Sequence, residues 1–304
     1  MINQILQGVM LGGYYALIAC GLAFMFSVMR IINLAHGSLA VASAYLIFVL
    51  TEKAKLPLAA GFVIAMIAMA IVGWLIQRLI LDRSARGGQL LPILSTFGLS
   101  MVIDNSLFEQ FGADTRSLAN AIGDLSWASW ELPGGIYLGK LPVLIFATAV
   151  VLLASLQLML SHTTLGRAIR ATAEDPDTAG LMGIDAAKVN AAAAAIAMVT
   201  VTIAGMFLAM RATFEPYSGA PQLLFAFEAA VIGGAGSLWG TLIGGIVLGI
   251  AQTVGASLHP LGFLIAGHAV FLVILLARLF LPDLGLLPAK LLNRTKFLYR
   301  GDAA

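Results

Sequence analysis

Apolar stretches recur along this chain, separated by short polar segments. Most approach or exceed the roughly 20 residues that a helix needs to cross a bilayer. They cover residues 5–29, 38–50 (short), 57–80, 90–111, 141–160, 190–210, 222–234 (short), 238–257 and 262–281. The alternation of apolar and polar residues that marks the strands of an outer-membrane barrel does not recur. The pattern predicts an all-α, polytopic membrane bundle with eight or nine membrane segments.

The composition is that of a membrane protein. Hydrophobic residues make up 60% of the 304 residues and charged residues 11%, and the mean hydropathy is +0.97. A water-soluble domain carries about 25% charged residues, so this chain has too few polar side chains to cover a globule in water. Its single cysteine, Cys20, lies inside the first apolar stretch, which excludes a disulfide within the chain. We expect one membrane domain over residues 1–304.

Lysine and arginine residues are distributed unevenly between the two predicted sides of the bundle. If residues 78–88 face the cytoplasm, twelve of the 17 basic residues lie on that side and five on the other, which fits the positive-inside rule. The inner group ends with Lys290, Arg294, Lys296 and Arg300. This distribution predicts a cytoplasmic loop at 162–189, an external loop at 113–140, an external N-terminus and a cytoplasmic C-terminus.

A short helix is predicted inside the loop at 162–189. Asp175 is a good N-cap, Pro176 fits the first helical position, and Gly183 can adopt the left-handed conformation that ends a helix. Asp185 can cap the helix that re-enters the membrane. A helix of about two turns is not stable alone in water, so it either packs against its own bundle or docks into another protein.

The run RAIRATAEDPDTAGLMGIDAAKVN in this loop resembles the cytoplasmic coupling loop of ABC-importer permeases. Three other stretches extend the resemblance: GGYYALIACGLAFMFSVMRIINLAHGSL near the start, LSTFGLS at 94–100 and FEAAVIGGAGSLWGTLIGGIVLG near the end. Together, in the same order and over nearly the whole chain, they resemble the LivH-type permease of branched-chain amino acid importers. For contact with the ATPase subunits, the resemblance points to Arg167, Arg170, Glu174, Asp175 and Gly183.

The resemblance implies a transport subunit of the bacterial inner membrane, for branched-chain amino acids or related small polar solutes. The implied partners are a second related permease, two ATPase subunits, an extracytoplasmic solute-binding protein and the lipid bilayer, with no nucleic acid. The chain has no G-x-x-x-x-G-K-[ST] phosphate loop, so we expect it to bind no cofactor and its partners to use the ATP. We also find no catalytic or metal-binding cluster. Composition alone would equally permit a secondary transporter or a channel.

Polar residues interrupt the join between the first two apolar stretches. Arg30, Asn33 and His36 are spaced by three, which would gather them on one side of a helix. Gly37 then permits a break, and Ser38 can begin a new half-helix whose positive end suits a carboxylate. For Asn33 and His36, a helix cap or an interhelical hydrogen bond is the alternative to a solute contact, and Arg30 is favoured as an anchor at the cytoplasmic boundary.

The segment GGAGSLWG repeats this pattern near the end of the chain, because both segments contain Gly-Ser-Leu, at 37–39 and at 236–238. The glycines at 236, 240 and 244 favour close helix packing, while His162, His259 and His268 are interpreted as interfacial or packing groups. Asp104 and Glu228 are carboxyl groups within apolar stretches, so they should face the bundle interior or a partner. The predicted pathway residues are Asn33, His36, Gly37, Ser38, Thr96, Asp104, Glu228, Gly236 and Ser237.

Two positions depart from the pattern of the family that this chain resembles. Many relatives carry an acidic residue where this chain has Ser38, and a lysine where it has Phe225. If both positions lie along the pathway, the solute need not be an aliphatic amino acid. Urea, short amides and aromatic acids stay open as alternatives.

Overall fold

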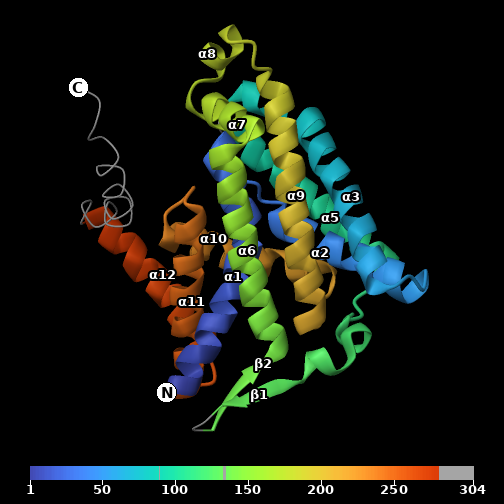
Figure 1. Ribbon diagram of the computed structural model, residues 1–304, viewed down its shortest axis with the longest axis vertical. Helices are drawn as coiled ribbons and strands as arrows, with labels where there is room; N and C mark the ends of the chain where they lie inside the picture. Colours follow the sequence, from blue (N-terminus) through green and yellow to red (C-terminus); the bar gives the residue numbers. More distant parts are fainter. Residues whose placement is uncertain (89, 133–134, 281–304) are drawn as a thin grey trace.

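All nine predicted stretches are helical in the computed structural model, which describes residues 1–88, 90–132 and 135–280 (Figure 1). The elements are α1 (Ile2–Met29), α2 (His36–Phe48), η1 (Val49–Lys53), α3 (Leu58–Ile76), η2 (Gln77–Leu81), α4 (Asp82–Ser84), η3 (Ala85–Gly87), α5 (Leu90–Phe111), η4 (Ala119–Ser126), β1 (Ser129–Leu132), β2 (Ile136–Gly139), α6 (Lys140–His162), α7 (Thr164–Glu174), α8 (Pro176–Leu181), α9 (Ala186–Arg211), η5 (Pro216–Ser218), α10 (Gly219–Gly233), α11 (Leu238–Leu258) and α12 (Gly262–Phe280). Within these ranges seven helices are long and apolar enough to span a membrane. The short α2 and α10 complete the predicted eight or nine segments, so the fold class is confirmed.

The two ends of the bundle differ in what they carry. Figure 1 shows α7 and α8 at one end, with the chain's N-terminus and the hairpin of β1 and β2 at the other. The loop at 162–189 and the loop at 113–140 therefore lie at opposite ends, as the predicted topology requires. The terminal Lys290, Arg294, Lys296 and Arg300 lie outside the described residues.

Helix α1 forms the centre of the bundle. It packs against α6, α9, α10 and α11, and most of its length is buried. Glycines make the closest of these contacts possible, because a Cβ on Gly12 would overlap the backbone of Ile246, and one on Gly249 would overlap the Gly8 carbonyl. Without a hydrophobic force between helices in lipid, such close approach is a main source of helix association.

The packing predicted for the last glycine series is confirmed in two of its three members. A Cβ on Gly240 would overlap the Gly233 carbonyl, and one on Gly244 would overlap the Ala229 carbonyl. Gly236 instead lies in the turn between α10 and α11, with a φ of 86°.

The outer helices expose apolar side chains. Ile67 and Ile71 of α3, Val151 of α6 and Val273 of α12 are more than half exposed, as expected for surfaces that face lipid or another subunit. The loop at 113–140 adds an antiparallel pair, β1 and β2, in which Ser129 faces Gly139. It is the one sheet in the described part of an otherwise helical chain.

Candidate functional site

The short helices α2 and α10 meet at their N-terminal ends inside the bundle. A Cβ on Gly37 would overlap the carbonyl oxygen of Gly219, and a Cβ on Gly219 would overlap the backbone of Ser38. Each helix N-terminus carries roughly half a positive charge from the aligned peptide dipoles. Two positive helix ends therefore meet at the glycines.

The first break in the helices occupies residues 30–35, before α2. Arg30 ends α1 in the left-handed conformation, with φ 54° and ψ 26°, and α2 begins at His36. The prediction that Arg30, Asn33 and His36 share one helical face is therefore wrong. The prediction that Gly37 makes the break is also wrong: Gly37 lies within α2, where it allows the close contact with α10.

Hydrogen bonds within the chain hold this break in place. The side-chain oxygen of Asn33 accepts a bond from the amide of Ala35 at 3.0 Å. Nε2 of the fully buried His36 lies 2.7 Å from the carbonyl oxygen of Ile18, a contact that requires a proton on Nε2. The hydroxyl oxygen of Thr96 accepts from the Leu34 amide at 3.1 Å. His36 thus makes the interhelical bond expected as an alternative to a solute contact, whereas Asn33 bonds to a local turn before α2 instead of capping the helix.

Asp104 brings a carboxyl group to the junction of the two short helices. Its side chain is only 9% exposed and lies beside the Ser38 side chain. Its Oδ1 atom has no hydrogen-bond partner among the described residues. An acidic side chain suits a position beside positive helix ends, and at this junction the chain itself supplies one.

Glu228 forms the second intramembrane polar contact. Its buried carboxyl oxygen Oε1 lies 2.5 Å from Nδ1 of His268 on α12. Phe225, which stands where a relative's lysine is expected, stacks on His268 at a centroid distance of 6.3 Å. His268 is therefore more than the packing group that the sequence suggested. Because the two partners are 40 residues apart, no local pattern signals the pairing.

The second break lies at residues 234–237. Gly234 and Gly236 adopt positive φ values of 97° and 86°. Ser237 caps α11, since its hydroxyl oxygen accepts a hydrogen bond from the Gly240 amide at 3.0 Å.

Arg278 of α12 binds the C-terminal end of α10, which precedes this break. Its guanidinium donates to the carbonyl oxygens of Val231 and Ile232 at 2.6 and 2.7 Å, and so satisfies the end of α10. Because Arg278 lies 47 and 46 residues from these two partners, no local sequence pattern signals the contact.

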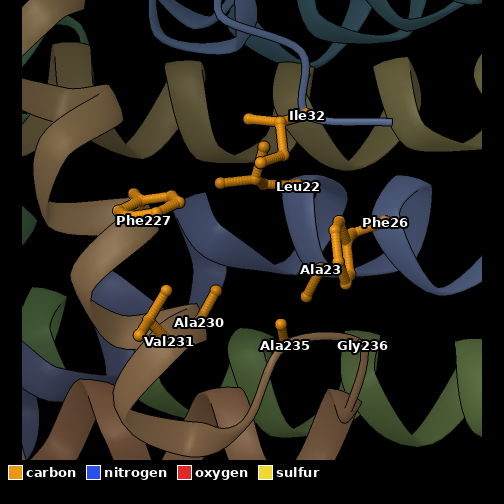
Figure 2. A pocket seen from close by; sticks show the side chains of 9 residues that line it. All are labelled: Leu22, Ala23, Phe26, Ile32, Phe227, Ala230, Val231, Ala235 and Gly236. Carbon is orange, nitrogen blue, oxygen red and sulfur yellow. The ribbon is translucent and has the colours of Figure 1, made fainter. Parts of the chain in front are cut away.

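A small apolar cavity lies between the two breaks and is lined by residues of both (Figure 2). Its volume is about 170 Å³, and none of its exposed lining is polar. It lies between α1, the loop before α2, α10 and the turn before α11. The lining residues are Leu22, Ala23, Phe26, Ile32, Phe227, Ala230, Val231, Ala235 and Gly236.

The loop at 162–189 folds as its capping residues predict. The carboxylate of Asp175 accepts from the amides of Asp177 and Thr178 at 3.0 and 3.2 Å and so caps α8. The Thr178 hydroxyl and these amides lower the pKa of Asp175. Gly183 has a φ of 80°, and Asp185 caps α9 through the Lys188 amide at 3.1 Å. Each of these predictions of local structure is confirmed.

The tip of this loop is exposed. Leu181 and Met182 are 88% and 80% exposed at the end of α8. The five residues predicted to contact ATPase subunits are also exposed at this end of the bundle: Arg167, Arg170, Glu174, Asp175 and Gly183. Among the described residues no three His, Cys, Asp or Glu side chains gather where they could hold a metal ion.

Comparison with known proteins gives consistent matches over most of the chain. The family model described as "Branched-chain amino acid transport system / permease component" matches residues 4–279. The high-affinity branched-chain amino acid transport system permease protein BraD of Pseudomonas aeruginosa is 29% identical over 266 residues, covering 84% of this chain and 86% of that protein. LivH of Escherichia coli K12 is 29% identical over 265 residues, with the same two shares.

An archaeal relative extends the similarity. The probable branched-chain amino acid transport permease protein LivH of Methanocaldococcus jannaschii is 28% identical over 293 residues, covering 93% of this chain and 92% of that protein. No solved structure matches the chain.

Proposed function

This chain belongs to the branched-chain amino acid transport system permease family, and we propose that it is the membrane subunit of an ATP-driven importer for branched-chain amino acids or related small polar solutes. The family match over residues 4–279 carries the proposal. The relatives are permease proteins of transport systems rather than enzymes. Seven helices among the described residues are long and apolar enough to span a membrane, so the chain is a multi-pass protein of the inner membrane.

The proposed complex contains two ATPase subunits, a second related permease and an extracytoplasmic solute-binding protein. In this complex ATP is bound by the partner subunits, and this chain needs no cofactor of its own. The described elements offer one face suited to each soluble partner: the α8 end to the ATPases, and the loop at 113–140, at the opposite end, to the binding protein.

The exposed apolar tip of α8 supports coupling to an ATPase subunit. Exposure of the apolar Leu181 and Met182 side chains to water is unfavourable in free energy. The position of α8 depends on its capping hydrogen bonds, because only Ala179 of this helix is buried. Docking into a groove of an ATPase would bury both side chains. Movement of the ATPases would then pass through α7 to the ends of α6 and α9, between which these short helices are connected.

We place the translocation pathway beside the junction of α2 and α10. Backbone that leaves the helical conformation inside a membrane protein is tolerated where it is buried or lines a cavity, and both breaks adjoin the apolar cavity. The residues proposed along or next to the pathway are Asn33, His36, Gly37, Ser38, Thr96, Asp104, Glu228, Gly236 and Ser237.

A double substitution at the α8 tip tests this function. Leu181→Ser with Met182→Ser should reduce both co-purification of the ATPase subunits and ATP-driven uptake at least tenfold, because the apolar docking surface is lost. Leu261→Ser, at a leucine that is 63% exposed in the connection between α11 and α12, is the matched control and should change neither. Unchanged co-purification and uptake in the double variant would contradict the coupling role.

The alternative is a secondary transporter or a channel. Uptake of solute into vesicles that contain this chain alone, with no ATPase and no ATP, would establish it. We expect no uptake under those conditions.

A further inference from the structure

Both helix breaks contribute to the lining of the apolar cavity. Ile32 reaches it from the first break, and Ala235 and Gly236 line it from the second, while Phe26 closes one wall from α1 (Figure 2). A group that enters the cavity would therefore touch both helix breaks. A lining without exposed polar atoms cannot satisfy the hydrogen bonds of urea or a short amide.

Arg30 lies next to the cavity. It lines an adjoining open hollow together with Phe26, Ser27, Ala235 and Gly236, three of which also line the apolar cavity. Its side chain is exposed, and the described residues include no salt bridge to it. A guanidinium is a strong partner for a carboxylate because it can donate two parallel hydrogen bonds.

The backbone conformation of Arg30 is energetically unfavourable, and a residue that only anchors the helix end by its charge would not need this conformation. Its φ of 54° lies in the left-handed region, where a residue with a side chain is disfavoured relative to glycine. A basic residue one position earlier or later would serve the topology equally well. The left-handed position fixes the root of the arginine side chain at the end of α1, beside the hollow.

We propose that the cavity receives the aliphatic side chain of the solute while the Arg30 guanidinium binds its α-carboxylate. This inference rests on the proposed function, since it takes the chain to be part of the solute pathway, and it selects aliphatic amino acids over urea, amides and aromatic acids. An aliphatic side chain of three or four carbons suits the volume of about 170 Å³. The site would hold the solute on the side of the bundle where α1 and α10 end.

Cysteine protection tests the site directly, because the natural Cys20 is fully buried and gives a low background. Ala235→Cys places an exposed thiol at the cavity in the assembled complex, in phosphatidylcholine nanodiscs. Leucine at saturating concentration should slow its labelling by a maleimide at least fivefold, whereas urea and leucinamide should have no effect. Ser161→Cys, exposed at the end of α6 and absent from the cavity lining, is the control that no solute should protect.

A second variant separates the carboxylate contact from the apolar contact. Arg30→Gln together with Ala235→Cys should require about ten times more leucine for half-protection, since a hydrogen bond to a charged group is lost. Equal protection by leucinamide, or protection that depends on added phosphatidylglycerol instead of leucine, would overturn the proposal in favour of another occupant.

ATP-driven leucine uptake, measured in parallel, keeps the two proposals apart. Uptake without any protection of Ala235→Cys would overturn the subsite and leave the transport function standing. Protection by leucine without ATP-driven uptake would support the binding site and count against the importer.

Discussion

The tripeptide Gly-Ser-Leu occurs at residues 37–39 and 236–238, and the fold uses its two copies differently. Gly37 lies inside α2 and permits backbone contact with α10, where a Cβ would overlap the Gly219 carbonyl. Gly236 lies in a turn with φ 86°, and a Cβ there would make ordinary contacts with Ser27 and Phe26. One glycine is required by the space around it and the other by its backbone angle.

The two serines differ in the same way. Ser237 caps the helix that follows it, through the Gly240 amide. Ser38 lies within the first turn of α2 and faces Asp104 from another helix. An identical local sequence thus marks a true break in one place and the inside of a helix in the other, which teaches that contacts with other helices set the role of each residue.

Substitution of the buried glycine should have the largest effect on stability. Gly37→Ala forces the α2 and α10 backbones apart, and backbone atoms cannot move as a flexible side chain can, so we expect a loss of about 3 kcal/mol in the free energy of unfolding. Titration with sodium dodecyl sulfate in mixed micelles, followed by tryptophan fluorescence, measures it. A loss no larger than that of Gly236→Ala would remove the contrast between the two glycines.

Removal of the Arg278 side chain should cause the second-largest loss in the free energy of unfolding. Arg278→Leu leaves the Val231 and Ile232 carbonyls without their donor, at a cost of about 2 kcal/mol in the free energy of unfolding. Arg278→Lys is the control, because it keeps the charge but not the planar fork and should restore only part of the loss. Full restoration by lysine would mean that charge alone matters at this break.

The turn glycine should give a smaller effect than either. Gly236→Ala keeps its surroundings but places a Cβ at φ 86°, which costs about 1.5 kcal/mol in the free energy of unfolding. The same titration measures the change. Gly236→Asn, which tolerates the left-handed conformation better, should lose less. An equal loss for both variants would argue that space, rather than the backbone angle, requires this glycine.

The cap serine should give the smallest effect. Ser237→Ala removes the acceptor for the Gly240 amide and should cost about 1 kcal/mol in the free energy of unfolding. Ser237→Asn retains a capping oxygen and should stay close to the unchanged protein. If alanine and asparagine behave alike, the hydrogen bond is not what defines the start of α11.

Much of the fold could be predicted from the sequence. Span length depends on runs of apolar residues, so α5 begins and ends within the predicted 90–111 stretch. Caps depend on residues three or fewer positions away, which is why Asp175 and Asp185 were identified correctly. Helix α2 begins at His36, two residues before the predicted stretch at 38–50, because contacts with Asn33, Thr96 and Ile18 hold the preceding loop and His36 in place.

The sequence by itself determined the membrane location, the helical fold class and the capped helix of the loop at 162–189, since each follows from composition or from close neighbours along the chain. Only the tertiary structure decided that Glu228 meets His268, that Arg278 ends a helix other than its own, and that Gly37 meets Gly219. The physical reason is the solvent. A helix surrounded by lipid is apolar on every side, so its pattern does not tell which face is buried, and the partners of each polar group are fixed only when the helices pack.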